Sequence, residues 1–181
     1  MIIEAKFLPI TPSVIPEDFF SNIKELLKKS NFLIYRVEEN LFSIEHWEAT
    51  KRIYEDNSAV IILHSNLRKY VPQENNIHLT SKHLMESDKK NVLFAGASCH
   101  NESEVKKALE LDLDYILISP IKKLSNKNSP LGWERFSKLA SLFPGPSFAL
   151  GGMNLNDLNE AKLYGAQGIA GIRSFFNLQN D

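Results

Sequence analysis

The sequence contains one cysteine, Cys99, and no long apolar run. A single cysteine excludes an intrachain disulfide and a zinc site built from cysteines. No stretch reaches the ~18 apolar residues that a membrane-spanning helix needs. The segment Met1–Ile10 carries Glu4 and Lys6 and lacks the basic start and long apolar centre of a signal peptide, so the sequence predicts a cytoplasmic protein.

An excess of one charge is missing as well. Lys and Arg total 21 and Asp and Glu total 22, which gives a net charge of −1. This balance provides no electrostatic attraction for nucleic acid or for an anionic membrane, so we expect neither as a partner. Hydrophobic residues make up 43% of 181 residues, which is typical of a globular protein and predicts one domain over residues 1–181.

What the sequence does contain is a regular alternation of short apolar runs with amphipathic stretches of helical length. The eight expected strands are 7–10, 32–36, 59–64, 76–79, 92–97, 115–119, 147–150 and 168–172. The expected helices are 18–29, 43–55, 101–111, 131–142 and 155–164, with single turns at 67–71 and 81–85 and a terminal turn at 174–178. Ser43, Asn101 and Asn154 are the expected helix N-caps.

Eight such units predict an α/β fold, a compact (β/α)8 TIM barrel with shortened helices 3 and 4. The strands show no clean polar–apolar alternation, which indicates parallel strands buried on both faces. The usual barrel has about 250 residues. This chain is shorter, and the expected third and fourth helices are reduced to single turns. The alternative, an open doubly wound sheet, needs a glycine-rich turn after the first strand to bind a nucleotide, and Ile10–Ser13 lacks one.

In a barrel, the functional site lies at the C-terminal ends of the strands. Gly151 and Gly152 follow the seventh strand, and Ile172 and Arg173 end the eighth. Backbone N–H groups at two helix starts predict a phosphate site there, with Gly152 at the start of its helix and no side chain to block the anion. The alternative is a pair of tight turns that bind nothing.

Two further groups of basic residues follow strands. Arg36, at the end of the second strand, must reach solvent or meet an anion, and a salt bridge to Glu38 or Glu4 is the alternative. After the sixth strand, a loop contains Lys122, Lys123 and Lys127. This loop is either a solvated flap or a mobile lid over a diphosphate.

Histidines and a serine complete the candidates. Ser98, Cys99 and His100 adjoin one another, which suggests either a nucleophile with its base or a structural helix start. His64, His78 and His83 lie near the ends of adjacent strands, so a metal site is an alternative hypothesis, although no ligand spacing defines one.

Four segments are similar to the thiamin phosphate synthase and thiazole tautomerase superfamily, within a region of strong similarity from about Leu93 to Phe176. They are Gly96–Glu104, Asp114–Ile121, Ala149–Met153 and Gly165–Ile172. Leu131–Phe136 resembles in particular the synthase-like domain that is fused to Nudix hydrolases. The resemblance implies a (β/α)8 barrel, in agreement with the count of units.

The resemblance also implies roles. The synthase joins a pyrimidine diphosphate to a thiazole phosphate and releases diphosphate with the help of Mg2+. Arg36, Ser98 and Lys127 match the diphosphate side, which would be catalytic through electrostatic stabilisation. Gly152 and the backbone at Ile172 and Arg173 match the thiazole phosphate site. If the chain is an enzyme, it is then a transferase of the thiamin-phosphate diphosphorylase type.

The chain departs from this pattern where the family holds Mg2+. Ser65 or Asn66 and His83 occupy the positions of the carboxylates, and Leu124 and Asn126 replace loop threonines. Mg2+ prefers carboxylate oxygens, so we expect it as a cofactor only if synthase activity is retained. His64, Asn66, His83 and His100 are additional candidate site residues.

The sequence therefore predicts a thiamin phosphate synthase-like protein that binds a phosphorylated thiazole or pyrimidine at the barrel mouth. The alternative is a non-catalytic module for a phosphorylated ligand, or a partner of a Nudix hydrolase. A homodimer is a further expectation. Another phosphate-binding barrel enzyme, such as an isomerase of amino-acid synthesis, would usually carry acid–base carboxylates at early strand ends, and Glu38 alone offers one.

Overall fold

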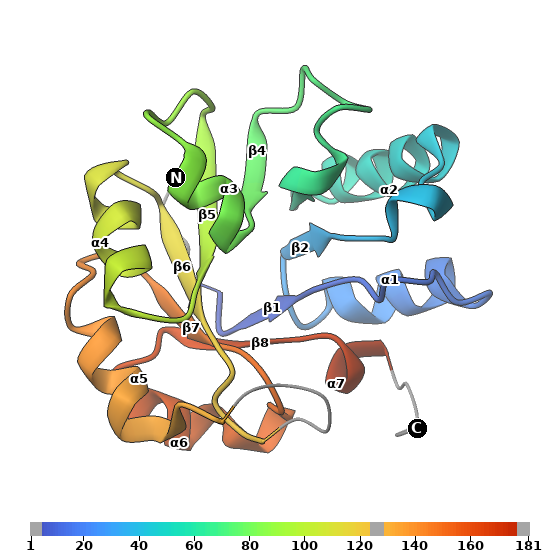
Figure 1. Ribbon diagram of the computed structural model, residues 1–181. Helices are drawn as coiled ribbons and strands as arrows, with labels where there is room; N and C mark the ends of the chain where they lie inside the picture. The colour runs from blue at the N-terminus through green and yellow to red at the C-terminus, as the bar shows by residue number, and fades with distance from the viewer. Residues whose placement is uncertain (1–4, 124–128, 177–181) are drawn as a thin grey trace.

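A computed structural model describes residues 5–123 and 129–176 of the chain. Eight parallel strands form one sheet. They are β1 (Phe7–Pro9), β2 (Phe32–Tyr35), β3 (Val60–His64), β4 (Asn76–Leu79), β5 (Phe94–Cys99), β6 (Tyr115–Ile118), β7 (Ser147–Ala149) and β8 (Gly168–Gly171). Helices surround this sheet on its outer side (Figure 1).

The α-helices alternate with the strands along the chain. They are α1 (Phe19–Leu27), α2 (Ile44–Asp56), α3 (Ser81–Glu86), α4 (Glu102–Glu110), α5 (Gly132–Ala140), α6 (Leu158–Leu163) and α7 (Arg173–Phe176). Short 3-10 turns are η1 (Glu39–Leu41), η2 (Ser65–Leu67) and η3 (Leu155–Asp157). None of the helices in the described ranges combines the length and the apolar character needed to cross a bilayer.

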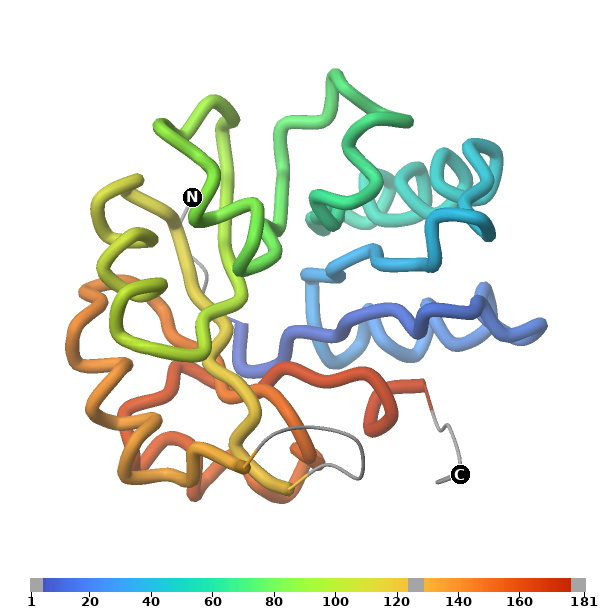
Figure 2. Tube along the Cα trace, in the orientation of Figure 1, coloured from blue at the N-terminus to red at the C-terminus, as the bar shows by residue number. Residues whose placement is uncertain are grey.

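The strand order is β1-β8-β7-β6-β5-β4-β3-β2, and both ends of this order meet. β1 and β8, the first and last strands of the chain, lie side by side (Figure 2). Between β1 and β2, a parallel bridge joins Ile10 to Ile34, and the Thr11 N–H donates to the Ile34 carbonyl at 2.9 Å. The sheet is thus closed into the predicted barrel, and the open doubly wound alternative is wrong.

Alternation along each strand separates two environments. On β5, Phe94 belongs to the cluster inside the barrel, whereas Ala95, Ala97 and Cys99 pack against the helices. The inner cluster contains Leu8, Ile10, Phe32, Ile34, Ile62, Phe94, Tyr115, Leu117, Phe148 and Ala170. Two larger clusters fill the space between sheet and helices.

Local signals placed most elements correctly. Ser43 and Asn101 cap their helices by accepting from the N–H groups of His46 and Glu104. The third helix is reduced to η2 and the fourth to the six residues of α3, as expected. The expected helix 155–164 is instead the 3-10 turn η3 followed by α6, with a capping box between Asn154 and Asp157.

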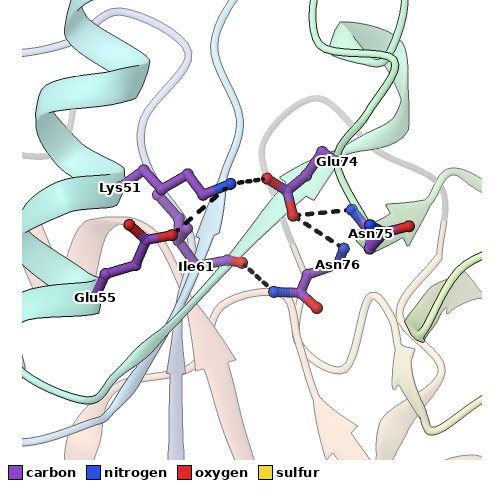
Figure 3. Close-up of polar contacts among 6 residues, drawn as sticks. All are labelled: Lys51, Glu55, Ile61, Glu74, Asn75 and Asn76. Atoms are coloured by element: carbon purple, nitrogen blue, oxygen red, sulfur yellow. Dashed lines mark hydrogen bonds and ion pairs between the residues drawn. The ribbon is translucent and has the colours of Figure 1, made fainter.

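A buried carboxylate holds the N-terminal end of β4 (Figure 3). Glu74 is 5% exposed, and its Oε1 accepts from the backbone N–H groups of Asn75 and Asn76 at 2.9 and 3.2 Å. Its Oε2 accepts from Lys51 Nζ on α2 at 2.7 Å. The Asn76 side chain donates to the Ile61 carbonyl at 3.3 Å. These contacts join α2, β3 and β4 where the helix after β3 is only a turn.

We predict that Glu74→Ala lowers the free energy of unfolding by about 3 kcal/mol, because a buried charge partner and two backbone donors lose their acceptor. Glu55→Ala is the matched control. Its carboxylate lies 3.8 Å from the same Lys51 Nζ but is 63% exposed, so the loss should stay below about 0.5 kcal/mol. Urea denaturation measures both, and similar losses would contradict the prediction.

We also predict that Gly168→Ala separates β8 from β1. A Cβ at Gly168 would lie 2.2 Å from the Lys6 carbonyl oxygen, a backbone atom that cannot rotate away. The expected loss is about 3 kcal/mol. Gly165→Ala, with φ +89° and open space around the position, should cost only about 1 kcal/mol. Equal losses in urea denaturation would show that the close approach of the strands does not matter.

Candidate functional site

Polar side chains gather inside one half of the barrel mouth. Alternation along β2 to β5 turns Arg36, His64, His78 and Ser98 to the interior, near the C-terminal ends of these neighbouring strands. The corresponding inward positions on the opposite half include the apolar Leu150 and Ile172 beside the inner cluster. Four of the residues named from the sequence are therefore on adjacent strands and on one face.

The backbone of Arg36 is held by the side chain of Thr11. Thr11 Oγ1 accepts from the Arg36 N–H at 2.7 Å and donates to the Arg36 carbonyl. No ion pair joins Arg36 to Glu38 within the described residues, and Glu4 lies outside them. The positive charge of Arg36 instead acts on His64, the inward residue of the next strand. A guanidinium on this wall makes the mouth suitable for an anion.

The ring of His64 is kept neutral by its surroundings. Burial, and then the charges of Arg36 and His83, lower its pKa to about 4. His64 and His78 face each other across β3 and β4, with ring centroids 6.0 Å apart. Because two cationic rings at this separation would repel, this wall favours neutral imidazoles.

His78 is 1% exposed and both of its ring nitrogens have partners. Nδ1 lies 3.0 Å from the Tyr115 hydroxyl and Nε2 lies 2.9 Å from Ser98 Oγ. The Tyr115 ring fits over Gly96, where a Cβ would lie 2.2 Å from the ring carbons. The pKa of His78 is far below its usual value because of burial and then the charge of His64.

Ser98, Cys99 and His100 do not form the group that the sequence suggested, because β5 places neighbouring side chains on opposite faces. β5 extends to Cys99, so Ser98 points inward and Cys99 outward among the helices. Burial, and then the charge of Glu104, raises the pKa of the Cys99 thiol, which makes it a poor nucleophile. His100 Nδ1 donates to the Ser119 carbonyl at 2.7 Å. The three residues therefore form no nucleophile–base pair among themselves.

The glycine pair after β7 adopts the left-handed backbone conformation. Gly151 has φ +97° and Gly152 has φ +75°. A Cβ on Gly151 would lie 2.8 Å from Pro120 Cα, and one on Gly152 would lie 2.7 Å from Lys122 Cβ. The helix-start position expected for Gly152 is wrong, because Asn154 is the cap. Glycine is required here by backbone conformation and by the adjacent chain.

The segment after β6 is joined to this turn. The N–H groups of Ile121 and Lys122 donate to the carbonyls of Leu150 and Gly151, each at 3.0 Å. Lys122 Nζ donates to Asp157 Oδ2 at 2.8 Å, in the capping box of η3. The loop residue Lys127 lies outside the described residues.

Free backbone donors lie at the ends of β7 and β8. Among the described residues, no acceptor receives a hydrogen bond from the N–H groups of Gly152, Arg173 or Ser174. Arg173 begins α7, as expected, and its side chain is exposed. The buried Ser174 hydroxyl also has no partner within the described residues, and a Cβ on Gly171 would lie 2.8 Å from its oxygen.

A surface cavity of about 610 Å³ adjoins the polar half of the mouth. It is lined by Glu39, Ser65, Asn66, Lys69, Thr80, Lys82 and His83. Ser65 Oγ and His83 Nδ1 lie 2.7 Å apart, and Ser65 Oγ accepts from the Thr80 N–H at 3.1 Å. The single carboxylate of the lining, Glu39, is paired with Lys69. Basic and neutral groups therefore dominate this side.

The sequence pattern of the thiamine monophosphate synthase family matches residues 8–175. The chain belongs to this family.

Individual relatives agree with this family. A putative thiamine-phosphate synthase 2 from Aquifex aeolicus is 26% identical over 168 residues, covering 88% of this chain and 90% of the relative. A thiamine-phosphate synthase from Fusobacterium nucleatum is 25% identical over 166 residues, covering 86% and 81%. The predicted superfamily is confirmed, and similarity extends beyond the C-terminal half that suggested it.

Solved structures show the same fold. A thiamine phosphate pyrophosphorylase from Pyrococcus furiosus superposes with a TM-score of 0.73 at 20% identity, covering 94% of this chain and 86% of that chain. One from Bacteroides thetaiotaomicron gives a TM-score of 0.66 at 22% identity, covering 97% and 86%. Within this family fold, Leu131–Phe136 has a packing role, since Trp133 stacks on Tyr164 with centroids 5.6 Å apart.

In this member of the thiamine monophosphate synthase family, the residues at the expected Mg2+ positions do not suit the ion. Hard Mg2+ takes oxygen ligands with near-octahedral geometry. Here Ser65 and His83 bond to each other, and Asn66 is an exposed amide. Residues 5–123 and 129–176 contain no group of three His, Cys, Asp or Glu side chains placed to hold a metal. The three-histidine metal hypothesis for His64, His78 and His83 is therefore also wrong.

Sequence reasoning named Ser98 and His78 but missed their connection through Tyr115. The available signal was alternation. His78 lies two residues after Asn76, and Ser98 lies two after Gly96, so both have the parity of inward positions. A glycine at an inward position opposite an aromatic residue on the next strand also indicates a ring that needs space.

We predict that stability decreases as the pH falls from about 6.5 to about 4, the unfolded and folded pKa values of His64. Below pH 6.5 the unfolded chain binds a proton that the folded chain rejects, so unfolding is favoured. His64→Gln should reduce this decrease by on the order of 2 kcal/mol, allowing for partial exposure. Thermal unfolding at pH 7.5 and 4.5 measures the difference, and identical decreases in both proteins would contradict it.

Proposed function

We propose that this chain binds a phosphorylated thiazole or pyrimidine of thiamine phosphate metabolism at the barrel mouth, and that it does so without Mg2+. The observation that carries the proposal is a set of N–H groups, those of Gly152, Arg173 and Ser174 at the ends of neighbouring strands, that donate to no acceptor in residues 5–123 and 129–176. A phosphate monoester offers the oxygens that such donors require. The Ser174 hydroxyl, which has no partner in the described part of the chain, supports the same ligand chemistry.

The second half of the mouth supports a further anionic group. Arg36 and Ser98 lie on the polar wall of β2 to β5, opposite the glycine turn. By resemblance to the family these residues, with Lys127, contact a diphosphate. Electrostatic stabilisation of a leaving diphosphate would be their catalytic role, if the chain retains one.

Loss of the Mg2+ ligands separates binding from turnover. Without carboxylates, the diphosphate's charge meets only protein cations and hydroxyls, so synthase turnover should be slow or absent. A coupled assay with pyrimidine diphosphate, thiazole phosphate and Mg2+ tests this part. Turnover at the ordinary rate of a synthase would refute the claim that the metal site has been lost. A Nudix hydrolase partner and a homodimer stay predictions.

The binding experiment is calorimetry with thiazole phosphate, thiamine phosphate and inorganic phosphate in the presence of a chelator. We expect at least one to bind, and Arg173→Gln to weaken that binding by at least about tenfold, because charge-assisted hydrogen bonds are lost. Arg52→Gln makes the same charge change on the exposed face of α2 and should leave binding unchanged.

Two results would refute the proposal. Equal weakening by both arginine variants would mean that overall charge, and no site at β8, determines affinity. Binding that disappears with the chelator and returns with Mg2+ would place a metal in the site. Gly152→Val is unsuitable as the test variant, because its φ of +75° and the nearby Lys122 would disturb the turn itself.

A further inference from the structure

Three side chains form a hydrogen-bonded chain from the barrel interior to its mouth. Tyr115, on β6, is fully buried and lies 3.0 Å from His78 Nδ1 through its hydroxyl. His78, on β4, lies 2.9 Å from Ser98 Oγ through Nε2. Ser98, on β5, is partly exposed at the mouth. The remaining question is the direction in which each proton points.

The Tyr115 hydroxyl determines the direction at its end of the chain. Burial, and then the charge of Asp114, holds its pKa well above the usual value, so the phenol keeps its proton. Within the described residues, His78 Nδ1 is the one acceptor that the hydroxyl meets. If Nδ1 carried a proton, the phenol proton would be buried without an acceptor, which is costly. The phenol therefore donates to a bare Nδ1.

The neutral state of His78 then determines the direction of its hydrogen bond with Ser98. Burial and the neighbouring His64 keep the pKa of His78 far below its usual value, so the ring carries one proton. With Nδ1 bare, that proton is on Nε2, which donates to Ser98 Oγ. The hydroxyl proton of Ser98 is thereby free to point away from His78, and the solvent-accessible direction is the mouth.

From this geometry we infer that His78 and Tyr115 are positioning residues that hold Ser98 as a hydrogen-bond donor toward an anionic oxygen of the ligand, an inference that rests on the proposed function. Ser98 is then selective for acceptors such as phosphoryl oxygens and unfavourable for amines. Activation of Ser98 as a nucleophile would need the opposite tautomer, with a bare Nε2 to accept its proton.

The first test needs no ligand. Nitrogen-15 NMR of labelled histidine distinguishes protonated from bare ring nitrogens. We expect His78 in the native protein to show a proton on Nε2 and none on Nδ1, between pH 6 and 8. In Tyr115→Phe, the donor to Nδ1 is missing, and the spectrum should shift toward a mixture of tautomers. A proton on Nδ1 in the native protein would overturn the inference, whether or not any phosphate binds.

The second test is affinity for inorganic diphosphate, measured by calorimetry with a chelator present. Ser98→Ala should weaken binding by about tenfold and Tyr115→Phe by about fivefold, as expected for one lost and one misdirected hydrogen bond. Tyr54→Phe is the matched control, because the Tyr54 hydroxyl is equally buried and has no partner in the described part of the chain. It should change neither affinity nor the His78 spectrum.

The outcomes separate the two proposals. If the native protein does not bind diphosphate, the proposed use of Ser98 fails. The tautomer result alone then decides whether the hydrogen bonds of Tyr115, His78 and Ser98 have the inferred direction. If Ser98→Ala weakens binding but Tyr115→Phe matches Tyr54→Phe in affinity, His78 and Tyr115 do not position Ser98. Circular dichroism and thermal unfolding of the three variants confirm that each remains folded at the temperature of measurement.

Discussion

Closure of the sheet between β1 and β2 is the constraint on which the rest of the structure depends. The Ile10–Ile34 bridge and the two hydrogen bonds of Thr11 to Arg36 leave no open edge. A closed parallel barrel divides every strand into inward and outward residues, and the inside of a barrel of this size is filled by side chains. A buried polar group at an inward position needs a partner inside the barrel, and His78 finds two in Tyr115 and Ser98.

The same constraint explains the division of the mouth. β2 to β5 contribute polar inward residues near their C-terminal ends, whereas the turns after β7 and β8 contribute backbone N–H groups. The first side would act through charge and oriented hydroxyls, and the second through main-chain donors. A ligand with anionic groups at both ends matches this arrangement. Beside Ser65 and His83, the lining adds Lys69 and Lys82, and its one carboxylate, Glu39, is paired with Lys69.

Sequence reasoning predicted the barrel because the strand count, the helix caps and the shortened third and fourth helices are all local signals. Asn154 was identified as a cap for the same reason. The crowding of Gly152 by Lys122 could not be predicted, because the two residues are distant in sequence. The parity of Ser98 was missed because β5 ends two residues later than its apolar run suggests. The Tyr115–His78 contact joins strands β6 and β4, which no local pattern connects.

The close fit of Tyr115 over Gly96 has a consequence for how such a chain can evolve. A larger residue at position 96 is tolerated only if the side chain at position 115 first becomes smaller. A smaller residue at position 115 would deprive His78 of the hydroxyl that bonds to Nδ1. Single substitutions at any of the three positions are thus unfavourable, while coordinated replacements are open. Lineages descended from this protein should keep the three residues or exchange them as a set, so their covariation would record the history of the buried polar chain.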